Sequence, residues 1–589
     1  MAFIEFLRRR PLAALLAMAL AACGNVPLLQ SAPMPPAAPV APPSFPATPL
    51  PLPSDMPSAA PAAAAASEPE PAPAALESPG VAARFPEPAV TYRTPAFAPG
   101  HEGFTSNAEL HEAMRSLVYD GGPKEGALTI KLLPLGSSQT GAPLEALFFT
   151  RDADAAMALP MRTPRPTVLL VGQQHGDEPA GSEALLVIAQ ELAQGKLQAV
   201  LNRINVVILP RANPDGAAAG KRATASGIDA NRDHLLLRTP EAQAQAQLVR
   251  DFAPMVVVDA HEFTAFGRYV QKFGAVQRYD ALTQYAMTAN LPEFVTKASE
   301  EWFRKPMLAR FKTEGIANQW YYTTSADVED KKISMGGVQP DTSRNVNGLT
   351  NAVSILIETR GGGIGRLHFK RRVYSHVVAI TSVLESAAQR SADLLKLRQF
   401  VDADVAAKGC QGDFIVEAEA TPSEYSLTML DPATGADKIV NVSWDSALAL
   451  NPLKIRARPC GYWLGAEQTD AVMRLRALGV QVRRADEPGS LRGETYRETS
   501  RATGVRSDVL GSIADAGGVL LVKVDLVPAL IDVPAGSFYV PLDQPLANLV
   551  LAALEPDTQN SYFANRIVTG MNQQARVMQR PEVRMTTLP

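Results

Sequence analysis

The chain is poor in cysteine, nearly neutral, and lacks a long apolar run beyond its first segment. It has three cysteines in 589 residues and a formal net charge of -4. A near-neutral balance gives no electrostatic case for nucleic acid binding, because proteins that bind nucleic acids carry a clustered basic patch. No transmembrane helix is expected after the N-terminal segment. With 46% hydrophobic and 20% charged residues, most of the chain is predicted to be globular, in two or three domains.

Two of the cysteines, Cys410 and Cys460, are not expected to bind metal. Neither has a Cys or His neighbour at ligand spacing. In an oxidising compartment they would pair. Two buried free thiols are the alternative, and the sequence does not decide between the two states.

The remaining cysteine, Cys23, ends a targeting signal. Three consecutive arginines precede an apolar stretch at 12–22 that is too short for an ordinary transmembrane helix. The run Leu-Ala-Ala-Cys at 20–23 resembles a bacterial lipobox, which implies lipidation of Cys23 and an anchor in the periplasmic face of the cell envelope. Gly24, where Asp would suggest inner-membrane retention, favours the outer membrane. An ordinary signal peptide with a chance cysteine is the alternative.

Composition divides the chain into four parts. After the signal peptide at 1–23, residues 24–100 are rich in Pro and Ala and have little periodic hydrophobicity. Such a segment cannot bury enough apolar area to fold and is predicted to be a disordered tether. Residues 101–400 are predicted to form a catalytic domain, and 401–589 a C-terminal accessory domain that is separate or closely packed.

Alternating strand-like and helix-like segments define the fold class of the catalytic part. Helices are predicted at 182–194 and 241–252, and one or two helices at 374–400. Short apolar runs, which are typical of strands buried on both faces, occur at 146–150, 168–171, 206–209, 255–258 and 354–357. This pattern predicts an α/β fold with a mixed, mostly parallel sheet flanked by helices. The C-terminal part is predicted to be a smaller mixed α/β domain.

A His-x-x-Glu pair and a distant histidine indicate a metal site. His175 and Glu178 follow the strand-like run at 168–171, and His261 follows the run at 255–258. Ligands bind beyond the carboxyl ends of parallel strands. Two imidazoles and one carboxylate are the usual protein ligands of a catalytic zinc ion and leave the fourth position for water. One Zn²⁺ is therefore predicted at these three residues.

A further carboxylate and a polar loop are expected near this site. Glu358 directly follows the run at 354–357, so its side chain would face the same crevice as the histidines. Hydrolysis of an amide by metal-bound water needs a carboxylate that takes the proton of the water. The loop after Leu209 carries more polar and basic residues than folding alone explains.

Four motifs in this order resemble the M14-type zinc metallocarboxypeptidases. The motifs are His175-Gly176-Asp177-Glu178, the run Gly-Ile-Asp-Ala-Asn-Arg-Asp at 227–233, Asp259-Ala260-His261 and Ile357-Glu358-Thr359. The resemblance covers roughly residues 104–400, and the C-terminal region resembles extensions on large bacterial relatives. It implies that zinc binds to His175, Glu178 and His261, that Glu358 is the general base and acid, that Arg222 stabilises the oxyanion, that Asn231 and Arg232 hold the terminal carboxylate of the substrate, and that Asp229 orients the first zinc histidine.

The sequence departs from the family pattern at two places. Asp177 stands where digestive members have a basic residue, and no tyrosine lies between Tyr322 and the catalytic glutamate. Tyr321 or Tyr322 is a candidate for the missing tyrosine. Arg344 and Arg360 are alternative polar partners for a substrate.

Hydrolysis of a peptide or amide bond near a free carboxylate is the predicted activity. The envelope location points to peptidoglycan-derived stem peptides as substrate. A zinc N-acyl amino acid deacylase of the aspartoacylase or succinylglutamate desuccinylase type is the alternative enzyme, and an inactive tethered binding protein is the alternative without activity. The Asn-Pro-Asp-Gly turn at 213–216 and the context of Glu358 favour a carboxypeptidase. The sequence leaves substrate specificity, the role of the C-terminal domain and the oligomeric state open.

Overall fold

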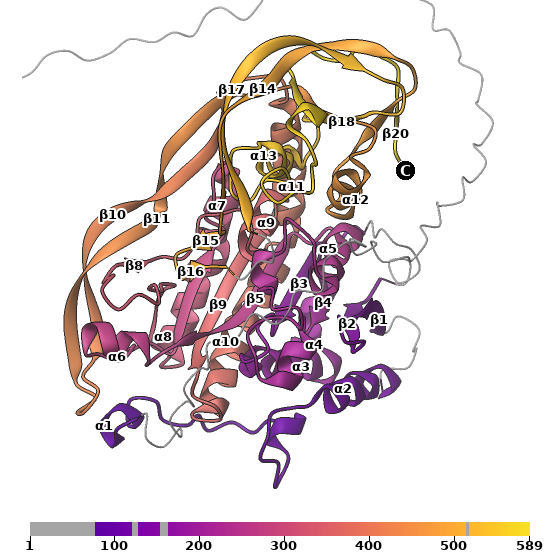
Figure 1. Cartoon of the computed structure of the whole chain (residues 1–589). Helices are drawn as coiled ribbons and strands as arrows, with labels where there is room; N and C mark the ends of the chain where they lie inside the picture. The colour runs from indigo at the N-terminus through magenta and orange to yellow at the C-terminus, as the bar shows by residue number, and fades with distance from the viewer. Residues whose placement is uncertain (1–76, 121–127, 153–162, 514–517) are drawn as a thin grey trace, which may run out of the picture. The chain divides into compact units, whose positions relative to one another are not determined.

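The computed structural model describes residues 77–120, 128–152, 163–513 and 518–589 (Figure 1). Of these, residues 77–588 belong to one compact unit. The predicted signal peptide, the lipidation site Cys23 and the tether up to residue 76 lie outside the described residues. Among the helices of the described part, none has the length and apolar content needed to cross a membrane.

A mixed eight-stranded sheet forms the centre of the catalytic part. Its strand order is β1-β2-β4-β3-β5-β9-β6-β7. The strands are β1 (Thr129–Ser137), β2 (Pro143–Thr150), β3 (Thr167–Gly172), β4 (Asn205–Leu209), β5 (Val256–Thr264), β6 (Ala281–Tyr285), β7 (Asn318–Trp320) and β9 (Val353–Gly362). The four central strands β4, β3, β5 and β9 run parallel. Strand β2 is antiparallel to β1 and β4, and β6 is antiparallel to β9 but parallel to β7. The predicted fold class is confirmed.

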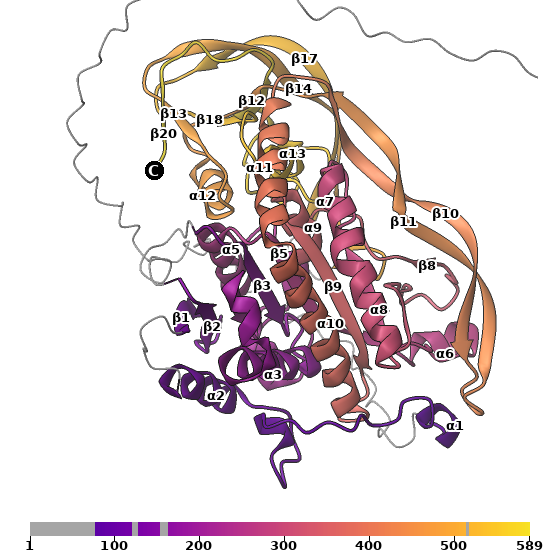
Figure 2. The same cartoon turned by 180° about the vertical axis from the view of Figure 1, so that it is seen from behind.

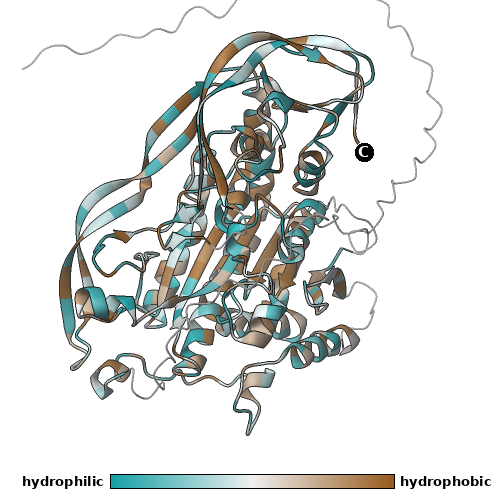
Figure 3. Ribbon diagram, viewed as in Figure 1, coloured by the Kyte–Doolittle hydropathy of each residue, from teal (hydrophilic) through white to brown (hydrophobic). Residues whose placement is uncertain are grey.

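Both faces of the central strands are buried, as their uniformly apolar sequences require. In β3, Val168 and Leu170 pack in the largest core cluster, which includes side chains of α3 (Pro179–Gln194) and α10 (Phe369–Gln389). Leu169 and Val171 point to the opposite face, where they pack with Leu248 of α5 (Pro240–Phe252). This alternation follows from the two-residue period of a strand. Figure 2 shows α3, α8 and α10 in front of the sheet, and Figure 3 shows the apolar character of its strands.

Helices begin and end where local sequence signals place them. In α5 (Pro240–Phe252), the side chain of Thr239 accepts a hydrogen bond from the backbone N–H of Ala242, and proline occupies the first turn. The other helices of this part are α2 (Asn107–Asp120), α3 (Pro179–Gln194), η3 (Lys196–Asn202), α4 (Pro214–Ala219), η4 (Ala230–Arg232), α6 (Arg268–Phe273), α7 (Glu293–Ala298), η5 (Ser299–Arg304), α8 (Lys305–Thr313), α9 (Ser343–Leu349), α10 (Phe369–Gln389) and α11 (Ser391–Ala407). The segment predicted as one or two helices at 374–400 is thus two helices, α10 and α11.

The C-terminal part is rich in strands. A long antiparallel ribbon pairs β10 (Asp413–Leu430) with β11 (Asp437–Ala457), and β11 pairs with β8 (Ile333–Ser334) of the catalytic part. A second sheet has the order β17-β14-β19-β12-β18-β13-β20. Its strands are β12 (Gly461–Leu464), β13 (Arg483–Ala485), β14 (Gly489–Gly504), β17 (Val519–Val533), β18 (Phe538–Pro541), β19 (Gln574–Val577) and β20 (Met585–Thr587). The remaining helices are α12 (Thr469–Ala477), α13 (Ala547–Leu554) and η6 (Met571–Gln573).

A disulfide ties the start of this C-terminal part to its sheet. Cys410 follows α11, and Cys460 immediately precedes β12; their sulfur atoms are bonded. Of the two states that the sequence left open, the structure contains the paired one.

The predicted tether ends earlier than residue 100. Short helices occur at α1 (Pro79–Ala82) and η2 (Pro95–Phe97). Val81 and Phe85 are buried in the main core cluster. Composition alone misplaces this boundary, because a proline-rich segment that cannot form its own core can still place isolated apolar side chains on a core built by other residues.

Candidate metal centre

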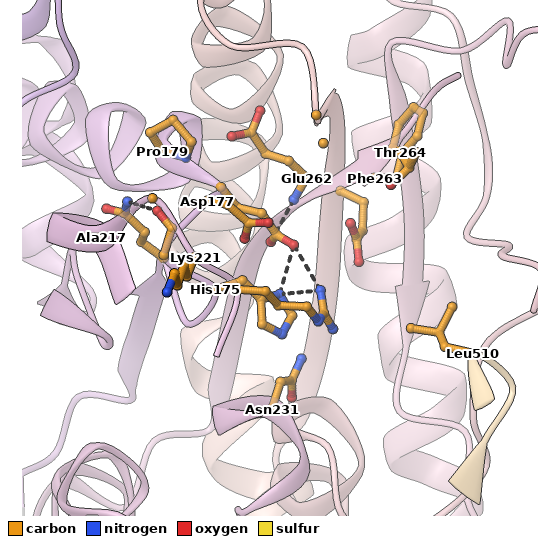
Figure 4. Close-up of a pocket in the computed structure, with 18 of the residues that line it drawn as sticks. His175, Asp177, Pro179, Ala217, Lys221, Asn231, Glu262, Phe263, Thr264 and Leu510 are labelled. Atoms are coloured by element: carbon orange, nitrogen blue, oxygen red, sulfur yellow. Dashed lines mark hydrogen bonds and ion pairs between the residues drawn. The ribbon is translucent and has the colours of Figure 1, made fainter. Parts of the chain in front are cut away.

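The structure brings the three predicted ligands together at one end of the parallel strands. His175 lies in the turn after β3, Glu178 immediately precedes α3, and His261 lies in β5. Their ligand atoms all lie within 4.8 Å of one another. Glu178 Oε1 is 2.8 Å from His175 Nδ1, and Glu178 Oε2 is 2.8 Å from His261 Nδ1. All three side chains are buried, and His175 is shown at the centre of the pocket in Figure 4.

Two aspartates orient the imidazoles so that both Nδ1 atoms face the cluster. The Nε2 of His175 is 3.0 Å from Asp229 Oδ1, and the Nε2 of His261 is 2.9 Å from Asp259 Oδ1. Each carboxylate accepts a hydrogen bond from the Nε2–H of its histidine, which leaves the lone pair of Nδ1 free for a metal ion. The role predicted for Asp229 therefore fits its position. The matching role of Asp259 was missed, although it lies two residues before His261 on the same strand and therefore on the same face.

The electrostatics of the cluster favour a cation. Burial opposes ionisation of Glu178, yet the adjacent His175 and His261 outweigh it and hold the pKa of this carboxyl well below its usual range. Burial likewise lowers the pKa of His261, but Asp259 and Glu178 raise it well above its ordinary value. Carboxylates that stabilise positive charge around two Nδ1 donors fit a divalent ion, and the donor set is that of a catalytic zinc site.

Glu358 lies opposite this cluster on the neighbouring strand. In the parallel pairing of β5 with β9, His261 is in register with Glu358. The Glu358 side chain lines the same cavity and is mostly buried. Burial, with the nearby charge of Glu178, raises the pKa of Glu358 to about 7, although the histidines and Arg222 oppose the shift. A carboxylate with such a pKa accepts and returns protons near neutral pH.

The loop that carries Arg222 packs directly on the His175 turn. Arg222 donates from Nε and Nη2 to Asp229 Oδ2 at 3.1 and 2.9 Å, and its Nη1 is 3.3 Å from Glu178 Oε1. Its backbone carbonyl accepts a hydrogen bond from the side chain of Asn213. The Asn-Pro-Asp-Gly segment, expected to be a turn, begins helix α4 with Asn213 as its cap. An Asx acceptor followed by proline serves a helix start as well as a turn.

Gly176 makes this close approach possible. A Cβ atom at Gly176 would lie 1.9 Å from a backbone carbon of Gly216 in α4. The glycine between the two predicted ligands of the first motif is therefore required by packing.

Asn231 and Arg232 occupy the pocket wall, but the Asn231 side-chain oxygen and the Arg232 guanidinium already have partners. The Oδ1 of Asn231 accepts the backbone N–H of Ser343 at 2.8 Å. Arg232 donates from Nε to Asp508 Oδ2 at 2.7 Å and from Nη2 to the same oxygen. Asp508 is 276 residues further along the chain, and no pattern in the sequence indicates this pair.

The cavity has a volume of about 1490 Å³, large enough for several residues of a peptide. Tyr321, Tyr322 and Arg344 line it. Arg360 does not, because its guanidinium lies over the rings of Phe85 and Phe266. Of the two alternative substrate partners, only Arg344 therefore faces the cavity.

Asp177 and several neighbouring side chains also line this cavity (Figure 4). Asp177 is exposed between the buried His175 and Glu178. This placement leaves its carboxylate free to meet solvent or a bound molecule, while its neighbours face the metal position.

The chain is similar to known proteins over much of its length. Residues 128–369 match the zinc carboxypeptidase family of M14 peptidases. Carboxypeptidase 2 of Trichophyton rubrum is 30% identical over 410 residues, which are 68% of this chain and 74% of that protein. Carboxypeptidase D of Mus musculus is 36% identical over 123 residues, covering 18% of this chain and 9% of that protein. A solved metallo-carboxypeptidase from Pseudomonas aeruginosa, in complex with (2-guanidinoethylmercapto)succinic acid, is 20% identical, with a TM-score of 0.35 over 49% of this chain and 68% of that one.

Proposed function

The chain belongs to the zinc carboxypeptidase family, and on that premise we propose that it hydrolyses the peptide or amide bond beside a free carboxylate in cell-wall stem peptides. It is a metallocarboxypeptidase. The observation that carries the proposal is the convergence of two Nδ1 atoms and one carboxylate within 4.8 Å, with Glu358 in register beside His261.

The residues of the site can divide the reaction between them. His175, Glu178 and His261 would hold one zinc ion, which supplies Lewis acidity and a bound water of lowered pKa. Glu358 takes the proton of the attacking water and returns it to the leaving amine. Arg222, held by Asp229, faces the negative charge that develops on the carbonyl oxygen. Arg232 and Asn231 are the proposed binding groups for the carboxylate of the leaving residue.

Mass spectrometry of peptide and muropeptide mixtures tests the activity. The wild type and Glu358→Gln are incubated with both mixtures, and bound zinc is measured in parallel. Glu424→Gln, a change at an exposed position on β10, is the matched control. We expect loss of cleavage in Glu358→Gln by roughly 10² to 10⁴-fold, with zinc retained. If zinc is bound and no product differs between wild type and Glu358→Gln, the proposed reaction is wrong.

The choice of substrate distinguishes the proposed carboxypeptidase from the alternative deacylase. Peptides with a free C-terminus should lose their last residue, and their C-terminal amides should be cut more slowly. Free N-acyl amino acids are the substrate of the alternative deacylase, and preferential cleavage of these compounds would replace the proposed function. Cleavage of ordinary peptides without any cleavage of muropeptides would retain the carboxypeptidase and remove the cell-wall assignment.

The cell-envelope location is part of the same proposal. It is supported by the three arginines, the short apolar stretch at 12–22 and the lipobox-like run that ends at Cys23. A lipid at Cys23 would hold the enzyme at a membrane, with the following Pro- and Ala-rich residues as a spacer. Labelled fatty acid should enter the wild type and not Cys23→Ala when both are expressed in bacteria. Equal labelling of the two proteins would refute the anchor.

A further inference from the structure

A short hairpin from the C-terminal part of the chain reaches the wall of the cavity. It pairs β15 (Ser507–Asp508) with β16 (Gly511–Ser512) in antiparallel register. The two residues between these strands, Val509 and Leu510, line the cavity. Figure 4 shows Leu510 beside the pocket that holds His175. A segment far from the catalytic motifs thus contributes directly to the substrate side of the site.

Asp508 of this hairpin forms an ion pair with the guanidinium of Arg232. Both Nε and Nη2 donate to Asp508 Oδ2, and Nη1 donates to the backbone carbonyl of Asn231 at 2.7 Å. The Asp508 and Arg232 side chains are 6% and 11% exposed. A second carboxylate cannot take the same edge of Arg232 while Asp508 remains there, because the two anions would compete for the same two N–H donors.

The hairpin is also held in place by contacts outside the pair of Asp508 with the Arg232 guanidinium. Arg506 donates to the backbone carbonyl of Arg232 at 3.0 Å and to Asp341 at 3.2 Å. Gln559 exchanges two hydrogen bonds with the backbone of Ser507. These contacts hold Asp508 at Arg232 before any ligand arrives, so the internal carboxylate acts at a high effective concentration.

Arg344 is the contrasting guanidinium in the same cavity. It is buried and donates to the carbonyl of Gly337, but its Nε has no hydrogen-bond partner in the described part of the chain. If Asp508 never left Arg232, Arg344 would be the group available to a substrate carboxylate. Carboxylate binding at Arg232 should therefore change when Asp508 is substituted, whereas carboxylate binding at Arg344 should not.

We propose that Asp508 is a specificity-determining residue that competes with the terminal carboxylate of the substrate for Arg232. The proposal rests on the proposed function, which makes Arg232 a carboxylate-binding group. A peptide with a free C-terminus binds by exchanging its carboxylate for that of Asp508. Its apparent affinity is therefore reduced by the fraction of molecules in which Arg232 is free. A peptide amide does not take part in this exchange.

Calorimetry on the zinc-loaded full chain tests the competition. The background is Glu358→Gln, so that the ligand is not consumed, and the probes are acetyl-trialanine and its C-terminal amide. Adding Asp508→Asn keeps the shape of the side chain and removes its charge. We expect the Kd for acetyl-trialanine to fall by about tenfold or more, and the Kd for the amide to stay the same. Asp525→Asn, which removes an exposed partner of Arg497, is the matched control and should change neither Kd.

The outcomes separate competition from a structural role. Equal weakening of both probes, or no change in the preference for the free carboxylate, overturns the proposal. Loss of that preference in Arg344→Gln, together with an unchanged Kd for acetyl-trialanine in Asp508→Asn, assigns the carboxylate to Arg344 and also overturns it. Asp508→Ser, with urea unfolding of each variant, separates a folding defect from a binding change. If the wild type cleaves no peptide but Asp508→Asn still tightens carboxylate binding, the proposed function fails and the competition stands.

Discussion

The two aspartates behind the zinc histidines allow a paired test of the metal centre. Asp259 is fully buried, and its Oδ1 lies 2.9 Å from His261 Nε2 and accepts Gln174 Nε2 at 2.7 Å. In Asp259→Asn, the side chain either loses its charge while still accepting from Nε2, or turns its amide toward the ring. The amide would donate to Nε2 and place the ring proton on Nδ1, the atom that must bind zinc. Both outcomes weaken the site.

The magnitude follows from the number of contacts that each aspartate makes. Loss of one such partner costs about 10 to 100-fold in metal affinity, or about 1.4 to 2.7 kcal/mol. Asp229→Asn should cost a similar amount, since Asp229 holds His175 in the same way. Asp229 also accepts two hydrogen bonds from Arg222. At saturating zinc, Asp229→Asn should therefore lower kcat further, by as much as about 10²-fold, whereas Asp259→Asn should recover most of its activity.

Competition with a fluorescent chelator measures the zinc affinity, and peptide cleavage at saturating zinc measures kcat. Asp404→Asn, in an exposed pair with Lys408, is the control for removal of one carboxylate charge. Zinc binding by Asp259→Asn as tight as that of the control would refute the tautomer argument. Full activity of zinc-saturated Asp229→Asn would refute the claim that Asp229 positions Arg222.

Three further predictions concern stability and packing. The bond between Cys410 and Cys460 spans 50 residues, so replacing both by serine should lower the free energy of unfolding by about 4 kcal/mol. A double variant that unfolds at the same urea concentration as the oxidised wild type would contradict this. Burial raises the pKa of Glu241 from 4.5 to about 7, so its ionisation destabilises the fold as pH rises through that window. Glu241→Gln should gain stability over the wild type between pH 5 and pH 7, by up to about 3 kcal/mol, and the gain should level off above pH 7; a difference independent of pH in urea unfolding would refute the assignment. Gly176→Ala should weaken zinc binding by about tenfold or more, because its Cβ would collide with the backbone of α4. Gly103→Ala is the control: its Cβ has no atom nearer than 3.7 Å, so the zinc affinity measured by chelator competition should stay unchanged.

The sheet and the metal ligands could be predicted because their determinants are local. Apolar runs such as 168–171 read as strands that need burial on both faces, and parallel strands bring their carboxyl ends to one edge. The positions of His175 and His261 follow from that geometry, since His175 lies just after β3 and His261 lies in the second half of β5, two strands in the centre of the sheet. Asp259 carried a usable signal as well, because residues two apart on a strand share a face.

Other features had no local signal. The burial of Val81 and Phe85 depends on a core that other segments build, and composition cannot reveal it. The pairing of Arg232 with Asp508 joins positions 276 residues apart. Any buried arginine needs a partner, but a single sequence does not say which of many carboxylates supplies it.

The C-terminal part contributes Val509 and Leu510 to the wall of the cavity. Arg474 of α12 donates to the backbone carbonyls of Leu236 and Leu237, shortly after Arg232 in the chain. Asp508 neutralises Arg232 from the same part. Removing one partner of such a buried pair leaves an uncompensated charge, which costs about 3 to 5 kcal/mol. The proposed zinc ligands come from β5 and from the turn after β3, whereas Arg232, the proposed group for the substrate carboxylate, pairs with the hairpin at 507–512. On this proposal, changes in that hairpin alter which carboxylates bind without touching the residues proposed to carry out the hydrolysis.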